Sequence, residues 1–439
     1  MIRRLWILAL VMAASTPPVW AQTRLTLAEA IARAQTRSFD ARSAELAERQ
    51  AVLRLTQARA GYLPSVDLTE SWQRGNQPVF VFSSLLAQRQ FTASNFAIDA
   101  LNRPEAVGNF RTAATVDQVL FDPATRAGVR VAQAGVDTAA VAREVVGQDL
   151  SVAVTSAYGA VLTAEAATRA AGAAVDTATA DVALARNRRD AGMVTDADVL
   201  QLQVALARAR EHQIRSTADA TVARAQLNHL LGEPLDAFVS LDDAPEPDAF
   251  GTTSVAALEA AAVATRPDLK LSVLRQQLAV AEVEAARAAF LPRVSAQAGW
   301  EANGGTVGAR SSSWMVGAVA RVNLFRGLAD HARLAEAREV QSMRALEREK
   351  AETSARLDVR VAMARLEAAR AAEIVGRAAV DQSREGHRII RDRYEGGLAD
   401  VTALLRAAEA MQQADARHAA ARVEVVVAAA TVKRATGTR

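Results

Sequence analysis

The chain has 439 residues, of which 23% are charged and 4% aromatic, and its formal net charge is only +3. Because it contains no cysteine, structural disulfides, thiolate metal sites and a cysteine nucleophile are excluded. The charges are spread without a basic run, so nucleic-acid binding is not predicted, and few aromatic residues together with abundant alanine favour long, closely packed helices.

The N-terminus has the pattern of an export signal. Residues 1–21 carry two arginines, then the apolar run Leu5–Ala13, then Val19-Trp20-Ala21, a small-x-small cleavage signal. The apolar run is too short for a transmembrane helix, which needs about 20 residues. The sequence therefore predicts a Sec-type signal peptide at residues 1–21 and a mature protein that leaves the cytoplasm.

The rest of the chain contains one pattern twice. Residues 58–64 (Ala-Arg-Ala-Gly-Tyr-Leu-Pro) return as residues 286–292 (Ala-Arg-Ala-Ala-Phe-Leu-Pro), and residues 186–194 return in similar form as residues 391–399. Matched landmarks in the same order indicate a duplicated structural unit. We expect a first structural repeat, a linker and a second structural repeat, at residues 22–234, 235–251 and 252–439.

Each half contains two segments with the alternation typical of strands. Residues 66–72 and 294–300 alternate most clearly, and residues 112–121 and 314–325 alternate more loosely. The sequence predicts four strands that form one β-hairpin in each half.

The two β-hairpins have different connections. The first contains the long insertion Arg74–Arg111, and the second the short segment of residues 303–313. From the sequence alone, the insertion either faces the outside or plugs the mouth of a channel.

Trp72 and Trp300 occupy matched positions on the first strand of each hairpin. They form either an aromatic girdle at a membrane interface or part of the core of a soluble β-sandwich. Their paired placement on two strands favours the girdle.

Proline placement predicts where long helices run. There is no proline between Pro123 and Pro234, and none after Pro292, and a proline inside a helix costs about 3 kcal/mol. Glycine breaks each window once, at Gly192 and at Gly396-Gly397. We expect two helical hairpins, with arms at residues 124–191, 195–231, 328–395 and 400–436.

Four amphipathic strands in an exported chain suggest a β-barrel in an outer membrane. A membrane barrel must close on itself, and the smallest need about eight strands. Four strands per chain therefore predict a barrel shared among two, three or four copies, with the helical hairpins closing laterally into a tube.

The sequence resembles the TolC-type outer-membrane factors over nearly all of its length after the signal. The resemblance is carried by the paired glycine turns, the helix–strand joints and the end of the first half: Tyr62-Leu63-Pro64, Phe290-Leu291-Pro292, Leu120-Phe121, Leu324-Phe325 and residues 227–234. It implies a mainly α fold with a small β part, trimerising into a 12-stranded outer-membrane β-barrel continued by a periplasmic α-barrel.

The resemblance also implies a function and partners. A homotrimer in the outer-membrane lipid would be the passive exit duct of a tripartite efflux pump or a type I secretion system. It would receive substrates from a periplasmic adaptor (membrane fusion protein) and an inner-membrane transporter.

In such proteins the glycine turns lie at the periplasmic tip, where the adaptor docks. The docking residues carried over by the resemblance are Gly192, Met193, Val194, Gly397, Leu398 and Ala399. The alternative is that these glycines only end helices and meet no partner.

The resemblance further implies a periplasmic gate near the tips, formed by Tyr394, Asp198 and Asp400. The family pattern would place acids near Ala403 and Arg406, where this sequence has none. The alternatives are that Tyr394 is a solvated tip residue, and that the two aspartates only complement helix N-terminal dipoles.

The sequence contains no recognisable catalytic, cofactor-binding or metal site. Its five histidines have no ligand spacing, so each is interpreted as a surface helix residue, and there is no Gly-x-Ser-x-Gly elbow. We therefore expect no enzyme and no cofactor. The main alternative function is a periplasmic coiled-coil adaptor or structural protein, and a secreted enzyme comes third.

Overall fold

The computed structural model describes residues 24–243 and 254–438. The predicted signal peptide at residues 1–21 lies outside these residues, as does the last part of the predicted linker 235–251. The chain divides into two compact units. Within the described residues, unit 1 comprises residues 24–38, 150–243 and 365–430, and unit 2 comprises residues 39–149, 254–364 and 431–438.

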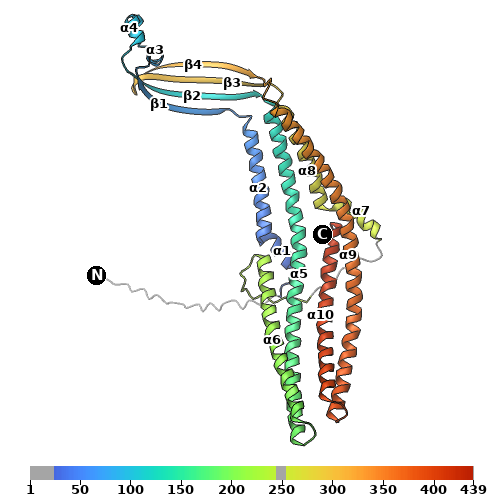
Figure 1. The fold of residues 1–439 in the computed structure, drawn as a ribbon. Helices are drawn as coiled ribbons and strands as arrows, with labels where there is room; N and C mark the ends of the chain where they lie inside the picture. Colours follow the sequence, from blue (N-terminus) through green and yellow to red (C-terminus); the bar gives the residue numbers. More distant parts are fainter. Residues whose placement is uncertain (1–23, 244–253, 439) are drawn as a thin grey trace, which may run out of the picture. The chain divides into compact units, whose positions relative to one another are not determined.

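Unit 2 contains one antiparallel sheet of four strands in the order β1-β2-β3-β4 (Figure 1). The four predicted strands are present, and their bounds are β1 (Ser65–Gly75), β2 (Val107–Phe121), β3 (Arg293–Thr306) and β4 (Ala309–Arg321).

The predicted connection at residues 303–313 was wrong. Only Val307 and Gly308 separate β3 from β4, and β4 ends at Arg321 instead of continuing to residue 325. The serines at 311–313 suggest a loop by composition, but they pair with residues 301–303 and continue the ladder.

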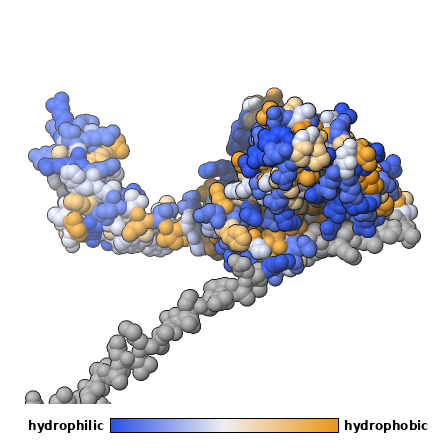
Figure 2. Space-filling model, turned by 90° about the horizontal axis from the view of Figure 1, so that it is seen from below, coloured by the Kyte–Doolittle hydropathy of each residue, from blue (hydrophilic) through white to orange (hydrophobic). Residues whose placement is uncertain are grey.

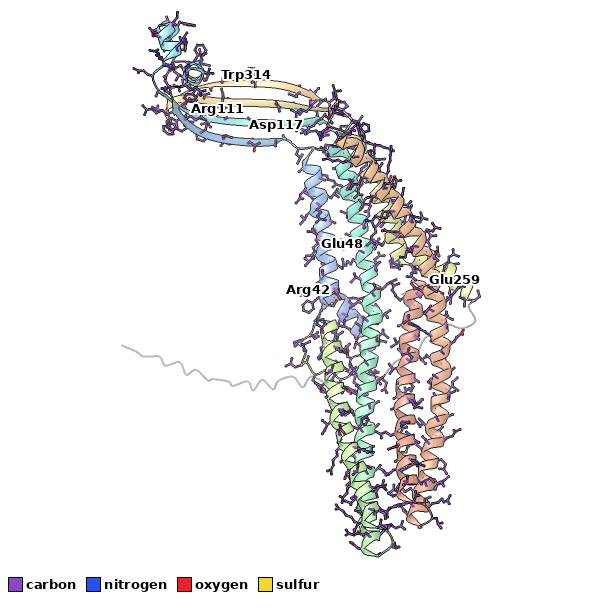
Figure 3. The ribbon with its side chains drawn as sticks, in the orientation of Figure 1. Arg42, Glu48, Arg111, Asp117, Glu259 and Trp314 are labelled. Carbon is purple, nitrogen blue, oxygen red and sulfur yellow. The ribbon has the colours of Figure 1, made fainter. Side chains whose placement is uncertain are left out.

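The register divides the sheet into two faces, because side chains alternate along a strand and paired residues share a face. The apolar face includes Val66, Leu68, Trp72, Phe110, Ala114, Val116, Ala298, Trp300, Trp314 and Val316. The polar face includes Asp67, Thr69, Ser71, Gln73, Asn109, Arg111, Asp117, Gln297, Glu301, Asn303 and Ser311. Figure 3 labels Arg111 and Asp117 on β2 and Trp314 on β4.

The sheet is joined to long helices, as the proline pattern predicts. The first helical hairpin is α5 (Pro123–Asp190) with α6 (Asp196–Leu231), and the second is α9 (Ala329–Glu395) with α10 (Val401–Thr436). The remaining helices are α1 (Leu27–Arg37), α2 (Phe39–Ala60), α3 (Pro78–Ala87), η1 (Ala93–Phe96), α4 (Ile98–Asn102), α7 (Val255–Thr265) and α8 (Pro267–Ala288). The mainly α fold with a small β part is confirmed.

Within unit 1, the core is built around α5. Val154, Tyr158 and Val161 are buried, and the Tyr158 hydroxyl lies 2.7 Å from the carbonyl oxygens of both Leu25 and Asp242. Burial raises the pKa of Tyr158 to about 12, so the hydroxyl stays protonated and can donate to either oxygen. This tyrosine fixes the segments before α1 and after α6 to α5.

In the described part of the chain, α5 is the one helix that is long and apolar enough to cross a membrane. A helix that packs in a protein core passes the same test, and α5 buries Val154 and Val161, although only 33% of its most apolar segment is buried. Viewed from below, hydrophilic residues cover much of the visible surface, with hydrophobic patches between them (Figure 2).

Candidate functional site

The tips of the two helical hairpins are glycine turns of the same geometry. Gly192 has φ +73° and Gly397 has φ +76°, a conformation that favours glycine. Met193 donates its backbone N–H to the Arg188 carbonyl at 2.8 Å, and Leu398 donates to the Arg393 carbonyl at 2.8 Å. These six-to-one hydrogen bonds are those of a Schellman motif, which ends α5 and α9.

The predicted docking residues at these turns differ in exposure. Met193 is 62% exposed and Leu398 is 73% exposed, whereas Val194 and Ala399 are half-buried. Ala399 packs against the hydrophobic cluster described below. Each tip therefore presents one large apolar side chain to solvent, which is the feature that a partner surface would cover.

Asp198 and Asp400 both stabilise helix N-termini. Thr195 and Asp198 form a capping box at the start of α6, and hydrogen bonds from the Thr195 backbone and hydroxyl lower the pKa of Asp198. Asp400 accepts a hydrogen bond from the Ala403 backbone N–H at 2.7 Å at the start of α10. Capping accounts for both residues locally, and their part in a gate stays a prediction.

Tyr394 is buried between the two helical hairpins, so its interpretation as a solvated tip residue was wrong. It belongs to a cluster with residues from all four arms: Val182, Ala185, Val199, Leu202, Val401 and Leu404. The reason is its position on the face of α9 that packs on α5. The Arg188 guanidinium lies over the Tyr394 ring, 5.0 Å from its centre, and donates a hydrogen bond to the Tyr394 carbonyl oxygen.

Two further titratable groups are buried near this cluster. Asp181 on α5 is 4% exposed and His387 on α9 is 8% exposed, and their charges interact. Burial raises the pKa of Asp181, against the opposing charges of Arg391 and His387. Burial lowers the pKa of His387, against the opposing charge of Asp181. His387 is therefore a correction to the prediction that every histidine lies on a helix surface.

We call Asp181 and Arg188 on α5, together with His387 and Tyr394 on α9, the polar seam. Each contains one buried polar atom without a hydrogen-bond partner among the described residues: Asp181 Oδ1, Arg188 Nε, His387 Nε2 and the Tyr394 hydroxyl. Unsatisfied buried groups cost stability, so this seam resists separation less than an apolar one would. Asp181, Arg188 and His387 were not predicted from the sequence. A spacing of seven residues, as between Asp181 and Arg188 and between His387 and Tyr394, places two residues on the same face of a helix and could have indicated them.

Trp72 and Trp300 lie on the apolar face of the sheet and are 59% and 45% exposed. Trp72 pairs with Phe110, with ring centres 6.1 Å apart, and Trp300 pairs with Trp314. The aromatic residues thus gather on the apolar face, and their place in an aromatic girdle stays a prediction.

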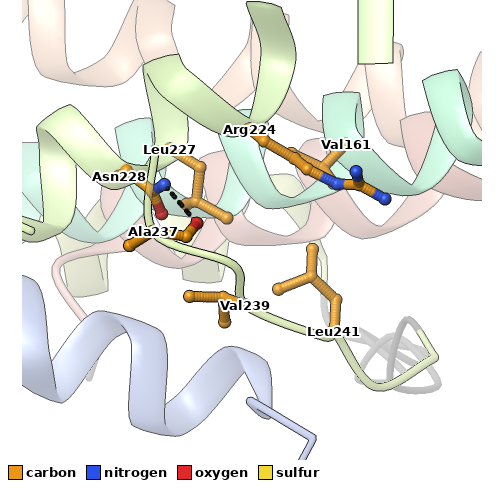
Figure 4. A pocket seen from close by; sticks show the side chains of 7 residues that line it. All are labelled: Val161, Arg224, Leu227, Asn228, Ala237, Val239 and Leu241. Atoms are coloured by element: carbon orange, nitrogen blue, oxygen red, sulfur yellow. Dashed lines mark hydrogen bonds between the residues drawn. The ribbon is translucent and has the colours of Figure 1, made fainter. Parts of the chain in front are cut away.

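The described residues contain no cluster of His, Asp or Glu suited to a metal ion. One hollow lies between α5, α6 and the segment after α6, lined by Val161, Arg224, Leu227, Asn228, Ala237, Val239 and Leu241 (Figure 4). Asn228 donates to the Ala237 carbonyl at 2.8 Å across it, and it leaves no space for a water-sized molecule. It therefore offers no small-molecule site.

Comparison with known proteins agrees with this architecture. A family model described as outer membrane efflux protein matches residues 30–233 and 259–438. Protein CyaE of Bordetella pertussis is 31% identical over 368 residues, which cover 82% of this chain and 73% of that protein.

Two solved structures have the same fold. The Campylobacter jejuni CmeC outer membrane channel matches with a TM-score of 0.78 at 16% identity, covering 94% of this chain and 85% of that one. The Vibrio cholerae outer membrane protein VceC matches with a TM-score of 0.75 at 18% identity, covering 94% and 96%.

Proposed function

The chain belongs to the outer membrane efflux protein family, and on this premise we propose that three copies form the exit duct of a tripartite efflux pump or a type I secretion system. The protein is an outer-membrane channel that extends into the periplasm of a Gram-negative bacterium, and it is not an enzyme. The alternative of a periplasmic adaptor has no further support.

The observation that carries the proposal is an amphipathic sheet with two open edges. Within the described residues β1 pairs only with β2, and β4 pairs only with β3. An open edge cannot remain in lipid, because its backbone N–H and C=O groups would have no partners. Pairing β1 of one copy with β4 of the next removes both edges, and three copies supply enough strands for a barrel.

The two faces of the sheet then have distinct surroundings. The apolar face, with Leu68, Trp72 and Trp300, would contact lipid, and the polar face, with Arg111 and Glu301, would line the duct. Arg111 and Glu301 form an ion pair at 2.8 Å on the polar face, and Glu70 and Arg310 form one at 2.9 Å on the apolar face. The assignment of the faces therefore rests on the apolar and aromatic side chains and not on the ion pairs.

We further propose that the tips serve both docking and closure. Gly192, Met193, Val194, Gly397, Leu398 and Ala399 would contact a periplasmic adaptor, which connects the duct to an inner-membrane transporter. Tyr394, Asp198 and Asp400 would act at the periplasmic gate. The exposure of Met193 and Leu398 supports the docking role, and the burial of Tyr394 between two hairpins that would separate on opening supports the gate.

The native mass of the full-length protein tests the proposal. The protein is expressed in a Gram-negative host, extracted from the outer-membrane fraction in mild detergent and measured by light scattering with correction for bound detergent. A membrane-bound species at three times the protomer mass is expected. A soluble periplasmic monomer would overturn the barrel, the duct and the gate together.

A further inference from the structure

The insertion between β1 and β2 folds over the polar face of the sheet. Here the insert means residues 76–106, which contain α3, η1 and α4. At the end of α3, Gln88 donates hydrogen bonds to Asn109 Oδ1 at 3.0 Å and to the Gly108 carbonyl at 2.9 Å. Asn109 belongs to the polar face, so α3 covers that face. It does so at the end of the sheet where β1 connects to β2 and β3 connects to β4 (Figure 1).

The contact continues across the sheet. Asn109 donates to Asn303 Oδ1 on β3 at 2.9 Å, and the Ser311 hydroxyl on β4 donates to the Gln88 carbonyl at 3.1 Å. Gln88, Asn109 and Asn303 are 4%, 9% and 2% exposed. The side-chain nitrogens of Gln88 and Asn109 are paired in this network, whereas Gln88 Oε1 is buried without a hydrogen-bond partner among the described residues. Because a buried donor is costly unless it is paired, these hydrogen bonds favour one position of α3 on the polar face.

The opposite side of α3 is apolar and uncovered. Val81, Ser84 and Gln88 are buried toward the sheet, and the side that faces away from it carries an apolar stripe, Val79, Phe82 and Leu86, exposed by 75%, 36% and 49%. The stripe continues onto the rest of the insert, because the rings of Phe82, Phe91 and Phe96 stack edge to face and Ile98 is 75% exposed. No charged residue lies between Arg74 and Arg89.

This arrangement indicates what covers the stripe. If the polar face lines the duct, as the proposed function requires, then the stripe points into the lumen at the outer mouth. The insert also follows β1, an edge strand that a neighbouring copy must pair with. Rotational symmetry therefore brings the uncharged stripes of all copies around the same axis.

We propose that the inserts of neighbouring copies pack against one another through the apolar stripe and constrict the outer mouth of the duct. The occupant of the stripe is thus a second copy of this chain. Lipid is a poor occupant, because the stripe lies on the side of the sheet opposite Trp72 and Trp314. This inference rests on the proposed trimeric duct and adds a second constriction to the one at the tips.

Cysteine cross-linking tests this directly, because the chain contains no cysteine and single substitutions give a clean background. Leu86→Cys and Ile98→Cys are placed in the stripe, and Val307→Cys is the control. Val307 is 65% exposed in the β3–β4 turn at the same end of the sheet. Outer-membrane fractions are treated with a short thiol-specific cross-linker and analysed on denaturing gels, with native mass measured in parallel.

The expected result is covalent dimers and trimers for the two stripe variants, at least tenfold more than for Val307→Cys, with a trimeric native mass throughout. A trimer without cross-links, or with equal cross-linking at Val307, would overturn the packing of inserts while leaving the duct intact. If the protein without substitutions is itself not a trimer, the proposed function is overturned, and this inference with it.

Conductance supplies a second measurement that does not depend on cross-linking. Replacing Val79, Phe82 and Leu86 together by serine should leave Val81, Ser84 and Gln88 on the sheet but remove the contact between copies. The trimer in planar bilayers should then conduct at least twice as much from the outer side. Unchanged conductance in a folded trimer would contradict the constriction.

Discussion

The guanidinium group of Arg188 covers the ring of Tyr394 at 5.0 Å and also donates a hydrogen bond to the carbonyl oxygen of the same residue. Arg188 is near the end of α5 and Tyr394 is near the end of α9, so one side chain joins the tips of the two helical hairpins. Any opening that moves one hairpin away from the other must break both contacts.

Replacing Arg188 by alanine should therefore make the closed duct leaky. A cation–π contact contributes about 0.5–2 kcal/mol and a hydrogen bond from a charged donor about 1.5–3 kcal/mol. We expect Arg188→Ala and Tyr394→Ala to raise the closed-state conductance of the trimer in planar bilayers. The matched control is Arg186→Ala, because Arg186 is exposed on the same turn of α5. Equal conductance in Arg188→Ala and the control would mean that this contact does not hold the tips closed.

The same seam should respond to acid through His387. Its folded pKa is lowered from an ordinary value of 6.5, so the closed state binds fewer protons than the separated state. The stabilisation of the closed state is complete above pH 6.5 and is lost as the pH falls below that value. We expect leak conductance to rise on acidification, and His387→Gln to remove this rise. His212→Gln, which changes an exposed histidine on α6, should leave the pH profile unchanged.

Asp181 should act with the opposite sign. Its pKa is raised from an ordinary value of 3.8, so the closed state binds more protons and its stabilisation is lost as the pH rises through the raised pKa. We therefore expect Asp181→Asn, measured over the same pH series, to reduce leak at the alkaline end of the profile and to leave the acidic rise in place. If Asp181→Asn also loses the rise in leak conductance at acidic pH, that rise depends on Asp181 and His387 together and not on His387 alone.

The long helices and the amphipathic strands follow from local sequence patterns. The ends of α5 and α9 agree with the proline and glycine pattern, because both residues act locally on the backbone. The amphipathic strands were also visible, since alternation along a strand is a local pattern. The tip turns and both tryptophans were found through duplication, which is likewise a property of the sequence.

The features that were missed depend on packing between distant segments. His387 and Asp181 are separated by about two hundred residues, and an alanine-rich helix such as α5 gives little sign of which face meets another helix. In the same way, the insert was recognised but not placed, because its position depends on hydrogen bonds from Gln88 to β2 and on the contact with Ser311 on β4.

The two faces of the sheet can be tested with neighbouring residues. Leu68 is on the apolar face and Thr69 is on the polar face of β1. An arginine on the lipid side of a membrane barrel costs about 2–4 kcal/mol near the midplane. We expect Leu68→Arg to lower the amount of trimer in the outer membrane strongly, and Thr69→Arg to assemble normally. Normal assembly of both variants would contradict the assignment of the faces.

Tyr158 should be a structural anchor whose contribution is constant over physiological pH. Its hydroxyl donates a hydrogen bond to the carbonyl oxygen of Leu25 or of Asp242, and a lost buried hydrogen bond costs about 1–3 kcal/mol. We expect Tyr158→Phe to lower the midpoint of thermal unfolding in detergent, equally at pH 6 and pH 8. Tyr62→Phe is the control, because Tyr62 is 44% exposed. The Leu25 carbonyl also accepts a hydrogen bond from the Asp242 backbone N–H at 3.0 Å. An unchanged midpoint for Tyr158→Phe would therefore show that the hydroxyl adds no stability to this junction.

The docking role of the tips can be separated from the stability of the turns. Leu398 is 73% exposed and Met193 is 62% exposed, so a charged replacement at either position removes little packing. By contrast, Gly397→Ala would force a residue with a Cβ to adopt φ +76°, which costs about 1–2 kcal/mol, and Gly397→Pro cannot adopt that angle.

We therefore expect Met193→Glu and Leu398→Glu to keep normal amounts of outer-membrane trimer but to lose transport, measured as accumulation of a fluorescent efflux substrate in cells. Leu398→Met keeps an apolar side chain of similar volume and should retain transport. If Leu398→Glu and Met193→Glu both transport normally, the tips do not dock through these side chains, and the glycines serve only to end α5 and α9.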